Sequence, residues 1–577
     1  MRARFSQWIS GIWWISLALP LLAIAQTTPS LHTGAQIVMV DVIVTDGHDN
    51  PVRNLQQRDF KISENGNEQA VSLFEEHSTA AAASPAAMPK LAPNVYTNFP
   101  TGTEGSPDNI LLFDLLNTPV DRQAFAKGQF LAFLKTVKPG TRLALFTLTS
   151  RLNLLQGSTS DPALLVAALN AIEIHSSPIL ADAIGTMGFA DSVAEMPMAK
   201  PAIARQNESE RSTEQNHFRA VYTLGAMGQL AHYLSGTPGR KTLIWFSNAF
   251  PSGLFNSTGS LQTDFRKTMN LLARSQVAVY PVGLRGLATS PLSDVSATKY
   301  ALNGGKAVNG DIDQFGTLVD DEHATSDRMA KATGGKVFDN ANDLDQAVTK
   351  ALEDGSHYYT LVYSPSDKRH DGSYRKISVV APSGYKLAYR DGYYADSSDS
   401  QPVKQAPGDI AAPDVMRAAM LRGAPAPSEI IFNAMVIADP ATSDKLAVGN
   451  KSSPKSKPPY RLLTIAYAAN PGDITMPERP DGTRQVDLDF VSLVYDREGQ
   501  LFTQQSNQVN VFANQTAIQQ VLKEGVRYQQ QIAVPAKGEY YLRMGVHDMI
   551  GDKVGVIEIP VALIARMAIP PASPPPK

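Results

Sequence analysis

One ten-residue stretch, Asn109–Thr118, constrains the fold of this chain more than any other. It reads NILLFDLLNT, an apolar run that is broken by one aspartate, Asp114, and closed by two small polar residues. A parallel strand that is covered on both faces has this pattern. Open α/β sheets bind ligands beyond the carboxyl ends of such strands. The stretch therefore predicts an α/β domain that presents Asp114 at its ligand-binding edge.

Strand and helix patterns alternate along residues 108–355. This alternation predicts an α/β fold with a doubly wound, mostly parallel sheet. Two irregular insertions, 176–216 and 285–322, fall on loops of this domain, where binding specificity usually lies. After the first strand, the strand patterns lie at Arg142–Leu148, Leu152–Leu155, Thr242–Phe246, Val277–Val282 and Lys336–Phe338, and the main helical patterns at Arg122–Val137, Pro162–Ile172, Arg219–Leu234, Asp264–Ser275, Ser326–Ala332 and Leu344–Leu352.

Short strand patterns flank the α/β region on both sides, at residues 34–77 and 356–395. Each flank has too few strands to bury a sheet face alone. We therefore expect the two flanks to pair into one β-sandwich, with the α/β domain inserted between them. Residues 78–107 and 396–428 are rich in alanine and proline, and we expect them to be linkers.

The C-terminal part of the chain returns to strand patterns with turn punctuation between them. Residues 429–565 predict a second β-sandwich of the immunoglobulin-like kind. Residues 566–577 are dense in proline, which is typical of a disordered tail.

Charge and cysteine content exclude several classes of function. The net charge of the 577 residues is -3, which argues against nucleic acid or an anionic membrane as a partner. The chain has no cysteine, so thiolate metal sites and cysteine nucleophiles are excluded.

The first 25 residues have the pattern of a secretory signal peptide. Arg2 and Arg4 precede the apolar run Ile9–Ile24, and Ala23-Ile24-Ala25 is a small-x-small cleavage pattern. The alternative is an uncleaved membrane anchor, but the run is short for a bilayer span. We expect cleavage, no later transmembrane segment, and a bacterial protein that is secreted or held in the periplasm or cell envelope.

Motifs spread over residues 36–395 resemble one family as a set. They are VDVIVTD, NPVRNLQQRDFKISENGNEQAVSLFEE, LLFDLLNT, GTRLALFTLTSRLNLLQGSTSD, GRKTLIWFSNAFP, ATGGKVFDNANDLDQAV and RDGYYA. The chain resembles the acidobacterial-type von Willebrand factor A-related secreted proteins. This resemblance implies a von Willebrand factor A fold. Proteins of that fold usually bind partners through Mg²⁺ or Mn²⁺ at the strand tips.

The family pattern after the first strand is Asp-x-Ser-x-Ser, and the chain matches it only in part. Asp114 stands at the aspartate position, and Thr118 at the second serine position can still ligate. Leu116 stands at the first serine position and cannot ligate. Asn117 offers an amide oxygen, but one position out of register. A hard divalent cation prefers several oxygen ligands, so a site with one carboxylate should bind it weakly.

The rest of the implied ligand set comes from other loops. Thr223 is the candidate loop threonine, with Thr186 and Thr213 as alternatives. After the fourth strand the family has an aspartate, whereas this chain has Ser247 followed by Asn248. The candidate metal ligands are therefore Asp114, Thr118, Thr223 and Ser247. The alternative is a metal-free scaffold in which Asp114 caps backbone amides or is solvated.

No Gly-x-Ser-x-Gly elbow occurs. Two Ser-x-x-Lys matches, Ser296–Lys299 and Ser452–Lys455, fall in irregular segments without the companion motifs, and we interpret them as chance matches. We expect a non-enzymatic adhesion or scaffold protein that binds another protein. One alternative is an accessory subunit of an envelope enzyme. Another is a carbohydrate-binding envelope protein, for which Tyr460, Tyr467 and Tyr495 are candidate exposed aromatics, although their pattern favours placement in the core.

Cleavage after Ala25 would produce a mature chain that begins at Gln26. N-terminal sequencing of the protein from the periplasm or medium of an expressing bacterium is expected to read QTTPS. Ala25→Arg should block processing, because the peptidase requires a small residue there. A wild-type protein that still begins at Met1 would contradict the prediction.

Overall fold

The chain divides into two compact units, Met1–Ala35 and Gln36–Lys577. The structure, a computed structural model, describes parts of the second unit only. The predicted signal peptide 1–25 and tail 566–577 lie outside the described residues. The residues that the structure describes are 37–78, 91–100, 109–172, 201–250, 260–284, 305–338, 344–396 and 414–564.

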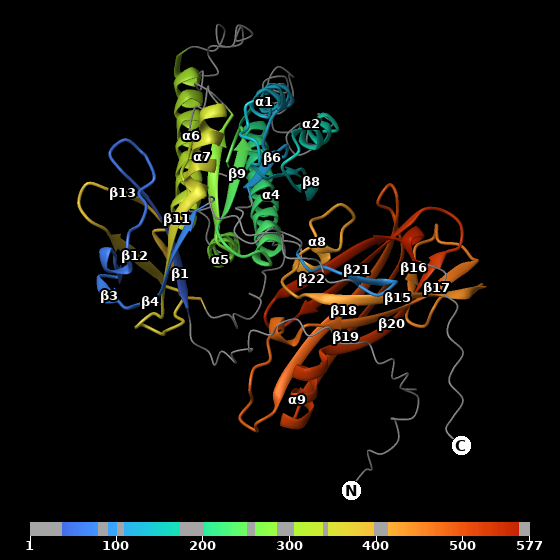
Figure 1. Cartoon of the computed structure of the whole chain (residues 1–577). Coiled ribbons are helices and arrows are strands. Elements are labelled where there is room, and N and C mark those ends of the chain that lie inside the picture. Colours follow the sequence, from blue (N-terminus) through green and yellow to red (C-terminus); the bar gives the residue numbers. More distant parts are fainter. Residues whose placement is uncertain are drawn as a thin grey trace. The chain divides into compact units, whose positions relative to one another are not determined.

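A five-stranded sheet in the order β10-β9-β6-β7-β8 forms the centre of the α/β region (Figure 1). Strands β10, β9, β6 and β7 are mutually parallel, whereas β8 runs antiparallel to β7. Only residues 149–151 connect β7 to β8, which is too short for a parallel crossover. The strands are β6 (Asn109–Asp114), β7 (Leu143–Leu148), β8 (Leu152–Thr159), β9 (Lys241–Ser247) and β10 (Val277–Gly283).

Helices pack on both faces of this sheet, because β6 is apolar on both sides. Ile110 and Leu112 pack in one cluster with α4, α5 and α6. Leu111 and Phe113 pack in another with α1, α2 and α7. The helices are α1 (Val120–Phe133), α2 (Pro162–Asn170), α4 (Pro201–Ser235), α5 (Ser260–Arg274), α6 (Gly305–Thr333) and α7 (Leu344–Ser356). Within the described residues, no helix combines the length and apolar character that a membrane span needs.

Part of each predicted insertion is helical instead of irregular. Residues 201–216 form the start of α4, and residues 305–322 belong to α6. Their composition suggested irregular loops, but helix extension is cooperative once a later part packs on a core. Met329 of α6 is one such packed residue. The remaining parts of both insertions lie outside the described residues.

Strands from both flanks build one N-terminal β-sandwich. Its sheets have the orders β13-β1-β11-β4 and β14-β12-β2-β3. Val38 lies opposite Tyr363, and Val42 opposite Tyr359, so the first flank pairs directly with the second. The strands are β1 (Val38–Thr45), β2 (Lys61–Glu64), β3 (Asn67–Gln69), β4 (Val71–Ser78), β11 (His357–Tyr363), β12 (Tyr374–Val380), β13 (Lys386–Ala388) and β14 (Gly392–Tyr394).

The C-terminal β-sandwich has sheets in the orders β20-β17-β15-β5 and β16-β19-β18-β21-β22. Tyr460, Tyr467 and Tyr495 are only 5%, 2% and 5% exposed, so they do not form an aromatic binding face. Its main elements are β15 (Phe432–Ser443), β16 (Lys451–Ser452), β17 (Tyr460–Ala469), β18 (Arg484–Asp496), β19 (Leu501–Ala513), α9 (Gln515–Glu524), β20 (Val526–Pro535), β21 (Tyr540–Asp548) and β22 (Lys553–Pro560).

Both predicted linkers contain structure that belongs to this C-terminal sandwich, which corrects the prediction. Residues Val95–Thr97 form β5, which pairs antiparallel with β15. In the second linker, Val415–Ala419 forms α8, whose Met416 packs in a cluster with Val556 of β22. A composition rich in alanine and proline does not reveal these elements, because each is stabilised by a surface that is distant in sequence.

Asn98, next to β5, makes the attachment of this strand to the C-terminal sandwich testable. Its Nδ2 donates to the carbonyl oxygen of Ile430 at 2.8 Å, and its Oδ1 accepts from the backbone N of Phe432 at 2.9 Å. Asn98→Ala leaves both backbone groups without this partner, and should lower the unfolding free energy by about 1–3 kcal/mol. Faster hydrogen exchange in β15 would report the same loss.

Asn510→Ala is the matched control, because Asn510 is an exposed asparagine of the same sandwich whose side chain donates to the side chain of Asp487. This control should change stability by less than about 0.5 kcal/mol. Equal effects of the two substitutions would show that β5 adds nothing specific to the sandwich.

Candidate strand-tip site

The tips of β6 and β9 place the predicted ligands on one face of the sheet. Side chains alternate between faces along a strand. Asp114 therefore lies on the face of Ile110 and Leu112, which α4 covers. Ser247, the last residue of β9, lies on the same face as Trp245 for the same reason. Because β6 and β9 are parallel neighbours, these tips meet at the carboxyl edge of the sheet.

The carboxylate of Asp114 is buried and is hydrogen-bonded by the protein itself. Asp114 is only 1% exposed. Its Oδ1 accepts from the backbone N of Asn117 at 2.9 Å. Its Oδ2 accepts from Asn117 Nδ2 at 2.7 Å and from Trp245 Nε1 at 3.0 Å. The Oγ of Ser247 also lies 3.0 Å from this Oδ2. The expectation that Asp114 lies open to a foreign molecule is therefore wrong.

Burial sets the direction of the pKa shift of Asp114. Removal from water penalises the charged carboxylate and raises its pKa, while the bonds from Asn117, Trp245 and Ser247 oppose this rise. The Ser247 hydroxyl also lies 2.6 Å from the carbonyl oxygen of Ala249, and its one proton serves a single acceptor at a time.

The side-chain amide of Asn117 occupies the centre of the cluster. Its Nδ2 donates to Asp114 Oδ2 and also to Thr223 Oγ1, at 3.1 Å. Its Oδ1 accepts from Arg219 Nε at 2.8 Å. These partners determine the orientation of the amide, because a guanidinium only donates and a carboxylate only accepts. A nitrogen therefore lies within hydrogen-bond distance of two predicted metal ligands, where a shared cation would have to lie.

Helix α4 contributes two side chains to this cluster, Arg219 and Thr223. They are four residues apart and thus lie on one face of the helix. Thr223 is fully buried. Both side chains contact Asn117, so the cluster attaches α4 to the tip of β6.

Thr118 has a structural role as well. Its buried Oγ1 accepts from the backbone N of Asn248 at 3.1 Å, which ties the segment after β6 to the segment after β9. Of the alternative threonines, Thr186 lies outside the described residues, and Thr213 lies in α4.

The residues at the strand tips do not fit a divalent cation. N–H groups already occupy the oxygens of Asp114, and the guanidinium of Arg219 adds a positive charge behind Asn117. One buried oxygen nearby, Asn248 Oδ1, has no partner, but a single neutral amide is a poor ligand set. Across the described parts of the chain, no group of three or more metal-binding side chains occurs either.

Two central residues, Trp245 and Arg219, were missing from the predicted site. Trp245 stands two residues before Ser247, so strand alternation alone places both on one face. Arg219 stands one helical turn before Thr223. Both positions can be inferred from the sequence. Trp245 and Arg219 offer no oxygen ligand, however, so the predicted metal site did not include them.

Comparisons with known proteins give only distant similarity. No protein-family model matches the chain, and no curated protein matches it. An aerotolerance-related membrane protein from Bacteroides fragilis is 12% identical, with a TM-score of 0.24 over 43% of this chain and 98% of its own. BatB from Bacteroides thetaiotaomicron is 10% identical, with a TM-score of 0.19 over 43% and 97%.

A von Willebrand factor type A protein from Catenulispora acidiphila is 8% identical, with a TM-score of 0.22 over 88% of this chain and 74% of its own. The likeness to von Willebrand factor type A proteins is therefore distant.

Titration of Mg²⁺ or Mn²⁺ into the metal-free full chain should produce no binding heat, because donors already surround Asp114. Isothermal calorimetry measures this directly. The control is Asp114→Asn, which keeps the size of the side chain and removes its charge. Heat in the wild type that disappears in this variant would contradict the geometry.

Proposed function

We propose that the chain is an exported, non-enzymatic scaffold whose von Willebrand factor A-like α/β unit binds another protein without a resident metal ion. The single observation that carries this proposal is the closed strand-tip cluster. Asp114, the carboxylate expected to hold a cation, is buried and bonded within the protein. Its polar groups hold β6, β9 and α4 together, so recognition falls to the surrounding surface.

Buried contacts between the α/β unit and both sandwiches support a scaffold role. On the C-terminal side, His232 Nδ1 of α4 lies 2.7 Å from Glu429 Oε2, and both side chains are buried. On the N-terminal side, the hydroxyl of Tyr358 accepts from the backbone N of Arg240 at 2.9 Å. Polar contacts of this kind restrict domain motion, which is otherwise the default. Such a unit can hold a binding surface at a defined position.

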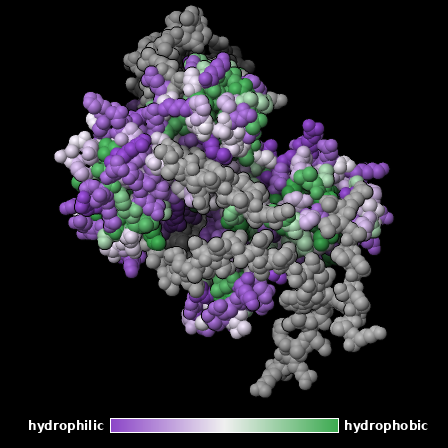
Figure 2. Space-filling model, viewed as in Figure 1, coloured by the Kyte–Doolittle hydropathy of each residue, from purple (hydrophilic) through white to green (hydrophobic). Residues whose placement is uncertain are grey.

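The von Willebrand factor A-like assignment, including double winding of the sheet, rests on the sequence motifs and on parallel strands with helices on both faces. Export rests on the signal-peptide pattern of residues 1–25. On the face in Figure 2, hydrophobic side chains occur as small patches among hydrophilic ones, which suits a partner contact of mixed character.

Two exposed residues beside the strand tips provide the test. Val120 starts α1 and is 43% exposed, and Arg151 lies in the exposed turn after β7. Photo-crosslinking residues at these two positions should yield adducts with one defined protein in envelope extracts of the producing bacterium. The matched control is Val448, which is 96% exposed in the C-terminal sandwich and should yield no such adduct. Adducts at Val448 alone, or at none of the three positions, would refute the proposal.

A further inference from the structure

One edge of the C-terminal sandwich is open along most of a long strand. Strand β19 has 13 residues and lies between β18 and the short β16 in its sheet. Strand β16 pairs only with Thr503 and Gln504 of β19. Among the described residues, no strand pairs with this side of Ser506–Phe512, the free edge of β19.

The neighbouring strand shows which backbone groups of the free edge point outward. The carbonyl oxygen of Asp487 in β18 accepts from the backbone N of Met549, on the side away from β19. Successive residues of a strand direct their backbone groups to opposite sides, so Leu488 bonds towards Val509, which lies opposite it in β19. The residues of β19 on either side of Val509 therefore point away from β18. Those with outward backbone groups are Ser506, Gln508, Asn510 and Phe512.

The free edge lacks the features that usually keep strand edges from pairing. The segment Leu501–Leu522 contains no charged residue and no proline. Val511 and Phe512 are 45% and 55% exposed. Valine and phenylalanine favour strands, and an exposed, uncharged edge is a template for a further strand.

The other long edge strands of the described sheets are protected by charges or by contacts within the chain. Strand β4 carries Glu75 and Glu76. Along β20, the side chain of Asn450 bonds to the backbone of Gln531 and Ala533. Strands β8, β10 and β22 each form backbone hydrogen bonds with a segment outside their sheet. The free edge of β19 is therefore an exception.

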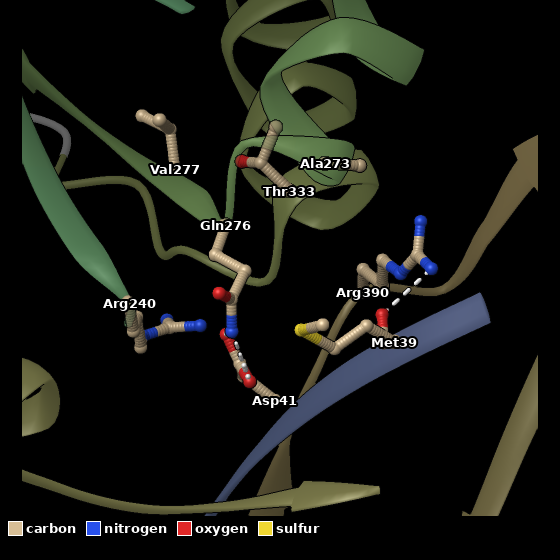
Figure 3. A pocket seen from close by; sticks show the side chains of 8 residues that line it. All are labelled: Met39, Asp41, Arg240, Ala273, Gln276, Val277, Thr333 and Arg390. Atoms are coloured by element: carbon tan, nitrogen blue, oxygen red, sulfur yellow. Dashed lines mark hydrogen bonds between the residues drawn. The ribbon is translucent and has the colours of Figure 1, made fainter. Parts of the chain in front are cut away.

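Polar groups at the small cavity between the N-terminal sandwich and the α/β unit also bond within the chain (Figure 3). There Gln276 Nε2 lies 3.2 Å from both carboxylate oxygens of Asp41. Arg390 Nη2 donates to the carbonyl oxygen of Met39 at 2.7 Å. These bonds connect strand β1 to neighbouring elements inside the chain, whereas the outward groups of β19 remain for a partner.

The free edge is complementary to itself. In an antiparallel pair related by a two-fold axis, residues with outward backbone groups must lie opposite each other. A pair centred on Val509 meets this condition and avoids the part of the edge that β16 occupies. It places Gln508 opposite Asn510 of the second copy, and no like charges meet. It also places Ser506 opposite Phe512 of the second copy.

Hydrogen bonds within the sheet already order the side chains of the free edge. Gln508 Nε2 donates to Asp487 Oδ1 at 2.8 Å, and Asn510 Nδ2 donates to Asp487 Oδ2 at 2.9 Å. Ser506 Oγ donates to Asp489 Oδ1 at 2.9 Å. A side-chain amide has two N–H groups and an oxygen, so Gln508 and Asn510 keep groups for the amide opposite. Side chains that are already ordered lose less entropy on binding.

We propose that the free edge pairs with the free edge of a second copy of this chain, antiparallel and centred on Val509. The five-stranded sheets of the two copies then form one continuous sheet by strand addition. Charges that would select a segment of another protein are absent from the edge, whereas self-pairing needs only the symmetry of the strand. The dimer presents two copies of the strand-tip surface of the α/β unit.

Sedimentation equilibrium of the full chain should give the mass of two copies, and Gln508→Pro should weaken the dimer about tenfold or more. Proline removes an outward N–H that pairing with β18 does not use, and edge strands tolerate it. The matched control is Gln508→Ala, which loses the same side chain but keeps the N–H and should stay dimeric. A monomeric wild type, or a folded Gln508→Pro that dimerises as strongly as the wild type, would overturn the proposal.

Disulfide trapping tests the register even if Gln508→Pro does not fold. The chain has no cysteine, so Val509→Cys adds one thiol to each copy. The two thiols lie opposite each other in the proposed register, and diamide should cross-link the dimer. The control is Val511→Cys, which is exposed but lies opposite Asn507 of the second copy, and should cross-link about tenfold more slowly. Equal rates for the two variants, or a faster rate for Val511→Cys, would contradict the register.

Discussion

The buried carboxylate of Asp114 is the interaction on which the α/β unit depends. An ionised group without water is tolerated only where hydrogen bonds replace its hydration. Asn117 and Trp245 supply those bonds, and Arg219 in turn donates to the amide oxygen of Asn117. A single side chain thereby connects two strand tips and a helix. The polar residues that resemble a cation site form a self-contained network.

Buried side chains of opposite charge lie at the two ends of the sheet. At the carboxyl end, one negative charge is surrounded by donors that the chain itself supplies. At the other end, Arg240 and Arg390 leave donors without acceptors. The first end therefore has no hydrogen-bonding group left for a ligand at Asp114. The partner contact that we propose therefore involves the exposed surface around the tips.

Several residues of the strand-tip cluster could be predicted from the sequence. The apolar run of β6 predicted that Asp114 lies at a strand tip, and this placement holds in the structure. The role of Asp114 was harder to predict, because the local sequence around an aspartate at a strand tip is the same whether its carboxylate binds a metal ion or accepts from an amide. Its surroundings come from Arg219, Thr223 and Trp245, which lie more than a hundred residues away. Those contacts form only when α4 packs on the sheet.

Local patterns in the sequence determined the mixed α/β content, because the apolar period of a strand or helix reflects its own burial. They also indicated that neither β flank could bury a face alone. Only the tertiary structure decided that β5 joins the C-terminal sandwich, that β8 runs antiparallel, and that Asp114 is enclosed. The reason is physical: strand pairing and the burial of charge depend on partners that are distant in sequence, and no local pattern records which partner is chosen.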